Sequence, residues 1–360
     1  MTEQFLASTA PVFKVDGETR GGLGRDLLRL EVEEGTEGLK ALCAHFIAVG
    51  PAGGEAESQL YLDGSVVDFG KKLEVSMGPP DAERIVFKGV ISGIEASFEE
   101  AEAPVVALFA EDTLMKLRMT RRMKTYENMS DADIAQAIAT EHGLTAEADV
   151  DGPTHDVVQQ WNMSDLAFLR ERAERVQAEI WIEEDKLFFK GRTKRAGTEI
   201  TLVKGNHLLS VQVRADLSHQ RTKVKVSGYD AEARDVIDEE AGNDAVQAEI
   251  TSGKTGPSVL ERALGERVSF RVRDVPLTAG EATAWARAEM LRRARMFVTA
   301  VGTTRGTPDM VVGSKLTLQG VGAPFEGGGY IATRVRHTYD LTLGHRTHFH
   351  AERPTLNEAP

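Results

Sequence analysis

Short segments of alternating apolar and polar residues, separated by closely spaced turn signals, fill the first third of the chain. Residues 28–32 and 72–77 alternate with a period of two, the pattern of a half-buried strand. Asp16-Gly17 and Asp63-Gly64 are dipeptides that favour turns. Strands this short bury apolar surface only by packing together, so the region predicts a barrel or a sandwich. The expected strands are residues 12–15, 28–32, 42–49, 60–62, 72–77, 85–91 and 105–109.

The pattern changes near residue 112, where helix signals begin. Ser130 and Ser164 each precede acidic residues, so each serine can cap a helix whose positive end those acids stabilise. Gly143 can end the first helix in a left-handed conformation. Residues 180–182 and 187–189 flank a charged turn and favour a hairpin. Residues 113–196 therefore predict a small α/β domain.

β structure then returns, interrupted by one long helix. Thr278 and Glu281 have the spacing of a capping box, and apolar residues continue toward Phe297. Residues 230–261 are polar, acidic and interrupted by glycine, which indicates an exposed loop. The expected strands are residues 199–203, 208–213, 222–226, 298–301, 315–318, 330–335 and 346–351.

These segments together predict an α+β, mainly β fold of two barrels with an inserted small α/β domain. The first barrel is expected in residues 1–112, completed by about residues 197–228. The α/β domain takes residues 113–196. The second barrel takes residues 229–360, with the acidic loop and the long helix.

Charge and cysteine content exclude several function classes. The 360-residue chain has a net charge of −13, which argues against nucleic-acid binding and against adhesion to anionic membranes. No apolar run approaches the roughly 20 residues of a membrane span. Met1–Gln4 lacks the basic start of a signal peptide, so folding in the cytoplasm is expected. Cys43 is the single cysteine, so it forms no internal disulfide and no thiolate metal site.

The best metal candidates are His348 and His350, which would share one face of a strand. Zinc normally takes three protein ligands, and the nearest carboxylates in sequence are Asp340 and Glu352. Two histidines without a thiolate form a weak signal. We therefore expect no metal and no cofactor, with these histidines on the polar face of a terminal strand.

Motifs for catalysis are also weak. No G-x-S-x-G elbow occurs, and Gly253-Lys254-Thr255 copies the end of a P-loop whose first glycine is replaced by Ala248. The glycine-rich stretches at 21–24 and 327–329 are expected to form turns. Carboxylate pairs would point to opposite faces of a strand, so no catalytic residue is expected. These pairs are Glu99-Glu100, Glu183-Glu184 and Glu239-Glu240.

A basic run spans residues 116–124, with apolar residues between the charges. It suggests a strand or link with one charged face. It could meet an acidic surface of a neighbouring subunit, such as that around Glu99, Glu100 and Glu102, or it could be a solvated connector.

Several segments resemble the phage late control D family. The family's Q-x-N-x-S-D-x-x-F-L-x-x-R-A run is matched between Gln160 and Ala173, and its later L-x-F strand by Leu187-Phe188-Phe189. Residues 123–134 and 141–144 are also similar. Near the end, Gly329-Tyr330, His337-Thr338-Tyr339 and Arg346-Thr347 resemble the family's closing strands. The N-terminal part matches in pattern only.

The resemblance implies a structural baseplate hub of a contractile tail or injection system. The family includes such hubs and the N-terminal part of VgrG. It implies a homotrimer with two tube-like β-barrel domains per subunit, whose pseudo-six-fold ring would join a hexameric tail tube above to a trimeric spike below, beside other baseplate proteins. DNA or cargo would pass through the lumen without specific binding. The protein would be made in the bacterial cytoplasm and located in a tail or particle baseplate.

VgrG-type chains continue into an OB-fold and a spike, and this sequence stops at Pro360, so the spike is expected to be a separate protein. One alternative is a tail-associated cell-wall hydrolase, which would need paired carboxylates in a cleft. Another is a metal-dependent binding module that uses His345, His348 and His350. Phage, tailocin and extracellular injection system remain open as the machine.

Overall fold

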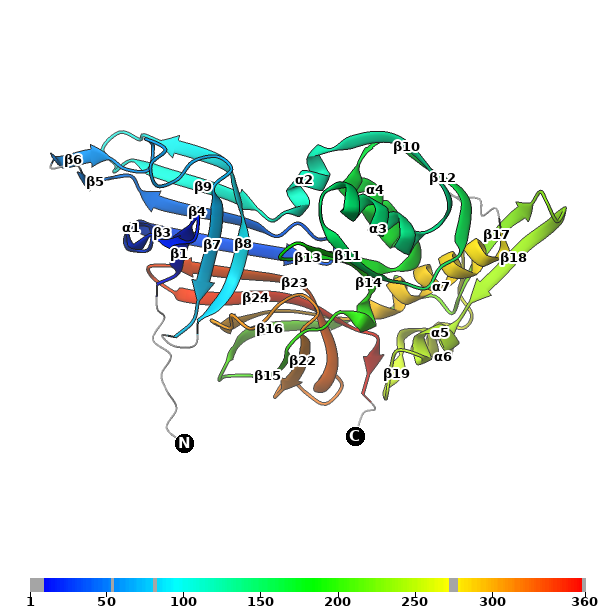
Figure 1. Cartoon of the computed structure of the whole chain (residues 1–360). Coiled ribbons are helices and arrows are strands. Elements are labelled where there is room, and N and C mark those ends of the chain that lie inside the picture. Colours follow the sequence, from blue (N-terminus) through cyan, green and yellow to red (C-terminus); the bar gives the residue numbers. More distant parts are fainter. Residues whose placement is uncertain (1–9, 53–54, 80–82, 272–277, 358–360) are drawn as a thin grey trace.

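A single large sheet dominates the computed structural model, which describes residues 10–52, 55–79, 83–271 and 278–357. The sheet has 13 strands, mostly antiparallel, and it confirms the predicted mainly β class (Figure 1). The expectation that the N-terminus is not a signal peptide concerns residues 1–9, which lie outside the described residues. The first half of the sheet contains β1 (Val12–Val15), β2 (Glu18–Thr19), β3 (Leu27–Gly35), β4 (Ala41–Ile47), β7 (Lys72–Met77), β8 (Arg84–Ser97) and β9 (Val105–Glu111).

The second half repeats the strand order of the first. Its strands are β15 (Glu199–Val203), β16 (Leu208–Ala215), β21 (Val298–Arg305), β22 (Lys315–Gln319), β23 (Gly327–Asp340) and β24 (Gly344–Arg353). The pairing order is β1-β7-β8-β9-β4-β3 in the first half and β15-β22-β23-β24-β21-β16 in the second. Each of these six strands has a counterpart at the same place in both the chain and the sheet, and β2 is an addition to the first half. One pairing differs, since β1 and β7 are antiparallel whereas β15 and β22 are parallel.

Bulges fall at matching positions of the two halves. The register between β3 and β4 shifts at Leu28, and that between β16 and β21 shifts at Leu209. The register between β8 and β9 shifts at Ser92, and that between β23 and β24 shifts at Thr333. The hydroxyl at each of the latter positions donates to the carbonyl at a matching position, Ser92 to Phe109 and Thr333 to His350, both at 3.3 Å. Since bulges are specific local features, their coincidence fixes the residue-by-residue equivalence of the halves.

The two halves meet where β3 pairs with β23. Seven residue pairs join them in antiparallel register, from Arg334 opposite Gly35 to Asp340 opposite Arg29. On one side of this junction Leu30, Val32 and Val335 are each 2% exposed. These side chains belong to two hydrophobic clusters, one under each half of the sheet. The junction therefore makes one continuous sheet over two cores.

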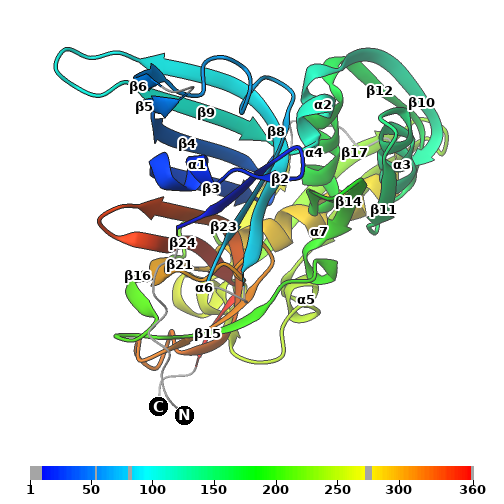
Figure 2. The same cartoon turned by 60° about the vertical axis from the view of Figure 1, so that its left-hand side comes forward.

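A separate α/β unit follows β9. It contains α2 (Leu114–Met119), β10 (Arg121–Ser130), α3 (Asp131–Glu141), β11 (Thr145–Asp149), β12 (Thr154–Ser164), α4 (Asp165–Val176), β13 (Ala178–Glu183) and β14 (Lys186–Gly191). Both predicted serine caps are present: Ser130 forms a capping box with Asp133, and Ser164 accepts from the Ala167 N–H. The unit has its own hydrophobic cluster and lies beside the large sheet (Figure 2).

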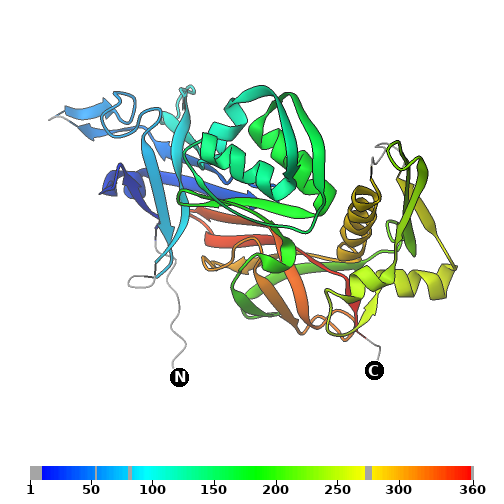
Figure 3. The ribbon, with the colours of Figure 1, turned by 45° about the vertical axis from the view of Figure 1, so that its right-hand side comes forward.

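The segment between β16 and β21 forms a fourth cluster. Its elements are β17 (Lys223–Asp230), β18 (Asp235–Ala241), α5 (Asn243–Gln247), β19 (Lys254–Thr255), α6 (Gly256–Leu264), β20 (Val268–Arg271) and α7 (Ala279–Arg295). Thr278 caps α7, which confirms the predicted long helix. The helix packs Ala282, Trp285 and Met290 in one cluster with β17 and β18. Figure 3 shows α7 beside these two strands. No helix in the described ranges is both long and apolar enough to cross a bilayer.

Two predicted assignments in the middle of the chain are wrong. Residues 197–228 do not complete the first half, because β15 and β16 pair with β22 and β21, and β17 belongs to a small sheet with β18 and β20. Residues 230–261 form a hairpin strand and helices rather than a loop. The reason is that Ile237 and Val246 are buried in the cluster beneath α7, which supplies the apolar contact that a polar, acidic segment lacks by itself.

Smaller differences concern local conformation. Residues 60–62 form no strand, because Tyr61 has a φ of 69° and its hydroxyl donates to Asp26 at 2.5 Å. Gly21–Asp26 is a short helix, α1, and residues 327–329 begin β23, so neither glycine stretch is a simple turn. The basic run is divided between α2 and β10. A hairpin of β5 (Val49–Ala52) and β6 (Glu55–Gln59) follows β4.

Two histidines are buried beneath β23 and β24. His337 Nε2 lies 3.1 Å from the Met310 carbonyl, which only accepts, so this nitrogen carries the proton. His337 Nδ1 then accepts from the Thr347 hydroxyl at 3.0 Å. Burial, with the nearby His345, lowers the pKa of His337 to about 3, and burial lowers the pKa of His345 to about 4. Both side chains are therefore held neutral.

We expect the folded state to lose stability between pH 7 and pH 5. Both folded pKa values lie below 6.5, the ordinary value, so the unfolded chain binds protons first as the pH falls. The stabilisation is complete above pH 6.5 and is lost as the pH falls toward the folded values. At pH 5 the loss is about 2 kcal/mol for each histidine, since one pKa unit corresponds to about 1.4 kcal/mol. Denaturant unfolding at the two pH values measures it.

His337 and His345 together account for one part of the loss of stability between pH 7 and pH 5. His337→Gln should remove about half of that part. His350→Gln is the matched control, because His350 is an exposed histidine in β24. An equal pH dependence in the parent protein and in His337→Gln would contradict the interpretation.

Candidate assembly surface

The large sheet has one face over the hydrophobic clusters and one bare face. Burial alternates along the strands, as in β4, where Leu42, Ala44 and Phe46 are buried and their neighbours are not. A cavity of about 980 Å³ lies over the bare face, where α2 and α4 of the α/β unit approach the sheet. Its lining from the sheet includes Glu31, Glu33, Cys43, Phe109, Arg334 and Glu352.

Charges on the bare face are paired across strands. Arg334 Nε lies 3.5 Å from Glu33 Oε1, and Arg336 Nη1 lies 3.6 Å from Glu31 Oε1, all at the junction of β3 and β23. Arg118 from α2 donates to both carboxylate oxygens of Glu111 at 2.6 Å. Each such pair contributes little stability when exposed. Their mutual neutralisation suits a wall or packing surface better than a site for a highly charged ligand.

His348 and His350 share one face of β24, as predicted, and His345 lies on the other face. His348 lies between the hydroxyls of Thr303 and Thr338, at 3.0 and 3.2 Å, and burial lowers its pKa. His350 is exposed further along β24, and His345 is buried on the opposite face. Within the ranges that the structure describes, no group of three histidine, cysteine or carboxylate side chains is placed to hold a metal ion.

The other sequence candidates have structural roles. Thr255 of the P-loop-like stretch is buried, caps α6 by accepting from the Ser258 N–H, and donates to Asn243. The side chains of Glu239 and Glu240 in β18 have separate partners. Glu239 accepts from Thr283, and Glu240 pairs with Lys223 and Lys225. Cys43 is partly buried in β4, 3.7 Å from His45 Nδ1, and burial raises the pKa of its thiol.

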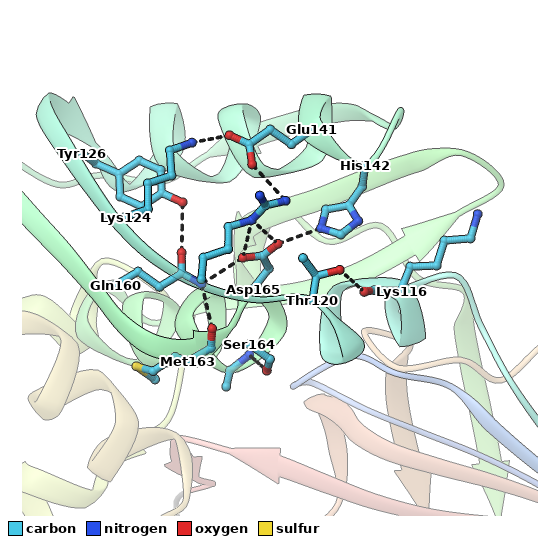
Figure 4. Close-up of polar contacts among 12 residues, drawn as sticks. Lys116, Thr120, Lys124, Tyr126, Glu141, His142, Gln160, Met163, Ser164 and Asp165 are labelled. Atoms are coloured by element: carbon cyan, nitrogen blue, oxygen red, sulfur yellow. Dashed lines mark hydrogen bonds and ion pairs between the residues drawn. The ribbon is translucent and has the colours of Figure 1, made fainter.

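Figure 4 shows the motif of the α/β unit, centred on the fully buried carboxylate of Asp165. Asp165 Oδ2 accepts from Arg122 Nε at 3.0 Å and lies 2.7 Å from His142 Nε2. Asp165 Oδ1 accepts from Gln160 Nε2 at 2.8 Å, and Gln160 in turn accepts from the Tyr126 hydroxyl. The carboxylate therefore joins β10, β12, the end of α3 and the start of α4.

The remaining motif residues shape the same turn. Asn162 has a φ of 47°, and its carbonyl groups accept from Arg121. Ser164 caps α4, while Phe168 and Leu169 are buried in the unit's cluster. The motif between Gln160 and Ala173 thus has a structural role, because its polar side chains form hydrogen bonds inside the α/β unit.

A second buried network was not anticipated from the sequence. Arg172 Nε donates to Asp131 Oδ1 at 2.5 Å, and Arg172 Nη2 lies 2.7 Å from His155 Nε2. His155 Nδ1 lies 2.7 Å from Glu281 Oε1. Burial lowers the pKa of His155, but its hydrogen bonds with Asp131 and Glu281 outweigh burial and raise that pKa above its ordinary value. Glu281 lies in the first turn of α7, so this network connects the α/β unit with the fourth cluster. Arg172 belongs to the family-like motif, but its partners are distant in sequence.

Solved structures with the same fold come from phage tails and a secretion system. A prophage tail protein from Shewanella oneidensis matches with a TM-score of 0.69 and 14% identity, over 96% of this chain and 98% of that one. A tail protein from Neisseria meningitidis matches with a TM-score of 0.65 and 12% identity, over 96% of each chain. An E. coli component of the type VI secretion system matches with a TM-score of 0.56 and 15% identity, over 97% of this chain and 79% of that one. At these identities the likeness concerns the fold.

The chain belongs to the family described as the Alg8 N-terminal domain, whose model matches residues 55–340. No curated protein sequence matches the chain. This match does not test the relationship to the late control D family that the motifs suggest, and that relationship stays a prediction.

Asp165→Ala should destabilise the α/β unit by about 3 to 5 kcal/mol, since it leaves Arg122, Gln160 and His142 without their shared partner. Hydrogen exchange in β10, β12 and α4, combined with denaturant unfolding, measures the loss. Asp133→Ala is the control, because Asp133 supports an exposed cap in the same unit and its removal should cost about 1 kcal/mol. Equal effects of the two substitutions would contradict the assigned role of Asp165.

Proposed function

We propose that the chain is the structural baseplate hub of a contractile tail or injection system. Three copies form a ring that joins a hexameric tail tube to a trimeric spike, and the ring contacts other baseplate proteins. The tail and secretion-system proteins that share the fold support a part in such a machine. The sequence resemblance to the late control D family supports the hub in particular.

The repeated strand order is the observation that carries this proposal. Each chain contains two six-strand units with the same pairing order and with bulges at matching positions. Three chains therefore supply six nearly equivalent units. An assembly with six similar units and true three-fold symmetry can face a six-fold partner on one side and a three-fold partner on the other.

The two units correspond to the tube-like barrel domains that the resemblance implies. In the second unit the ring of pairings runs from β15 through β22, β23, β24 and β21 to β16, and a bridge between Lys204 and Leu208 connects β16 back to β15. The first unit is more open, because β1 and β3 have α1 between them. We assign residues 10–111 to the first tube-like domain, and β15, β16 and residues 298–357 to the second.

The role we propose is assembly rather than catalysis. The carboxylates of Glu239 and Glu240 point to separate partners, which does not favour the cell-wall hydrolase alternative. The cavity of about 980 Å³ lies over paired charges on a sheet rather than over a constellation of nucleophile and base. The machine would hold this protein in its baseplate.

Native mass spectrometry of the purified full chain tests the proposal. We expect a mass of three times the 39.3 kDa chain, and electron microscopy should show rings with a central opening. Three-fold averages should retain six similar units along the inner wall. A mass of one chain at every concentration would exclude the trimeric hub.

A further inference from the structure

β8 and β16 are among the strands of the large sheet that have an open edge in the described part of the chain. β7 pairs with β8 only along Arg84–Val90, and the Ile91 backbone bonds to Gly70 and Lys71, so the same edge of β8 is open beyond Ile91. At the other end of the sheet, β16 pairs with β21 on one side and ends the strand order. Open edges of this kind are places where another chain can add a strand.

The internal repeat specifies which partner each edge fits. β23 is the counterpart of β8, and its equivalent edge is occupied by β3. β3 is in turn the counterpart of β16, so the pairing of β3 with β23 is a template for a pairing of β16 with β8. Within one chain six strands lie between β16 and β8 in the strand order. The complementary strand must therefore come from a second copy.

We propose that β16 of one subunit pairs antiparallel with residues 93–97 of β8 in the next subunit, in the register of the internal junction. This inference deepens the proposed trimer by naming its strand contact. The bulges at Ser92 and Thr333 align β8 with β23, and those at Leu28 and Leu209 align β3 with β16. Transferring the internal register gives Gly93 opposite Asp216, Ile94 opposite Ala215, Glu95 opposite Arg214, Ala96 opposite Val213 and Ser97 opposite Gln212.

Charge supports this register. At the internal junction Arg336 lies directly opposite Glu33, and at the proposed contact Glu95 lies directly opposite Arg214. The basic residue lies on β23 at the internal junction and on β16 at the proposed contact, so the charges are exchanged between the strands but remain opposite. Opposite charges at directly paired positions stabilise an antiparallel pair, and like charges destabilise it. A shift of one residue would place Glu95 opposite Val213 or Ala215.

Burial supports it as well. Val32 and Val335 at the internal junction are each 2% exposed, whereas their counterparts Val213 and Ile94 are only partly buried. Tyr339 packs on the first cluster across the junction, and its counterpart Phe98 is 58% exposed. The two free edges thus expose the apolar side chains that the internal junction covers. Pairing with a second copy would cover them in the same way.

The contact joins two different surfaces, so it is heterologous and propagates around a ring until the ring closes. With eight strands per chain in the continuous order from β8 to β16, three copies give one uninterrupted cylindrical sheet. Each copy uses its β16 edge once and its β8 edge once.

Disulfide cross-linking of the full chain tests the register. Glu95→Cys and Arg214→Cys are combined in a Cys43→Ser background, so that no native thiol competes. Directly opposite residues of an antiparallel pair have Cα atoms about 4.5 to 5.5 Å apart, which a disulfide spans. We expect mild oxidation to give a covalent species of three chains on a non-reducing gel. Glu95→Cys with Gln212→Cys is the matched control, because this diagonal pair would be about 7 to 8 Å apart and should cross-link poorly.

The outcomes separate this inference from the proposed function. A native mass of three chains without cross-linking of the opposite pair would overturn the strand pairing and leave the trimer intact. Efficient cross-linking that stops at two chains, with a native mass of two, would support the pairing and overturn the three-copy ring. A native mass of one chain would overturn both.

Charge reversal provides a second, independent measurement. Glu95→Arg or Arg214→Glu alone places like charges opposite each other at every subunit contact, which should weaken trimer formation about tenfold or more. The two substitutions together should restore it. Glu232→Arg makes the same charge change in the exposed turn between β17 and β18, outside the paired segment, and should leave the trimer unchanged. Failure of the double variant to recover would contradict the register, provided that each single variant retains its fold by circular dichroism.

Discussion

The antiparallel pairing of β3 with β23 is the contact on which the architecture depends. Two units of the same strand order, separated in sequence by the α/β unit, become one sheet through seven residue pairs. The hydrogen bonds satisfy backbone groups that would otherwise be exposed at two edges, and Leu30, Val32 and Val335 extend the apolar cores beneath the junction. Without this contact the edges of β3 and β23 would be open as well.

Buried ion pairs fix the inserted units against the sheet. Arg195 contacts Glu34 of β3 and Glu179 of β13, and its guanidinium lies 4.5 Å from the centre of the Trp181 ring. Arg192 bridges Glu179 and Glu352 of β24 at 2.9 and 2.6 Å. Buried pairs of this kind are weak evidence for stability, but they are costly to leave half satisfied. They therefore favour one relative placement of the α/β unit and the sheet.

Local features of the fold could be predicted from the sequence, and non-local ones could not. Ser130, Ser164 and Thr278 predicted helix starts, because a cap is decided by residues three positions apart. The assignment of β15 and β16 to the first half failed, because a strand's alternation identifies a buried face without naming its partner. The segment at 230–261 was misjudged for a related reason, since its burial depends on α7, which comes later in the chain.

The candidate surface could likewise be predicted only in part from the sequence. The motif from Gln160 to Ala173 was apparent as a pattern, but its polar contacts emerge only when β10 and α3 are folded around Asp165. The internal repeat left a faint trace, in which Leu27-Leu28 and Val32 recur as Leu208-Leu209 and Val213. In the equivalence that the bulges fix, Ala110-Glu111 of β9 also recur as Ala351-Glu352 of β24. Most other positions differ, since each repeat has adapted to different neighbours.

The two repeats differ most in one connection. Between β3 and β4 the chain turns within residues 36–40, whereas the matching connection between β16 and β21 holds residues 216–297 with β17, β18, α6 and α7. In a closed ring this large outgrowth would occur at every second repeat. The inner wall could then keep nearly hexagonal regularity while the periphery became strictly triangular, so the change of symmetry would be built radially, through what each repeat carries on its outside.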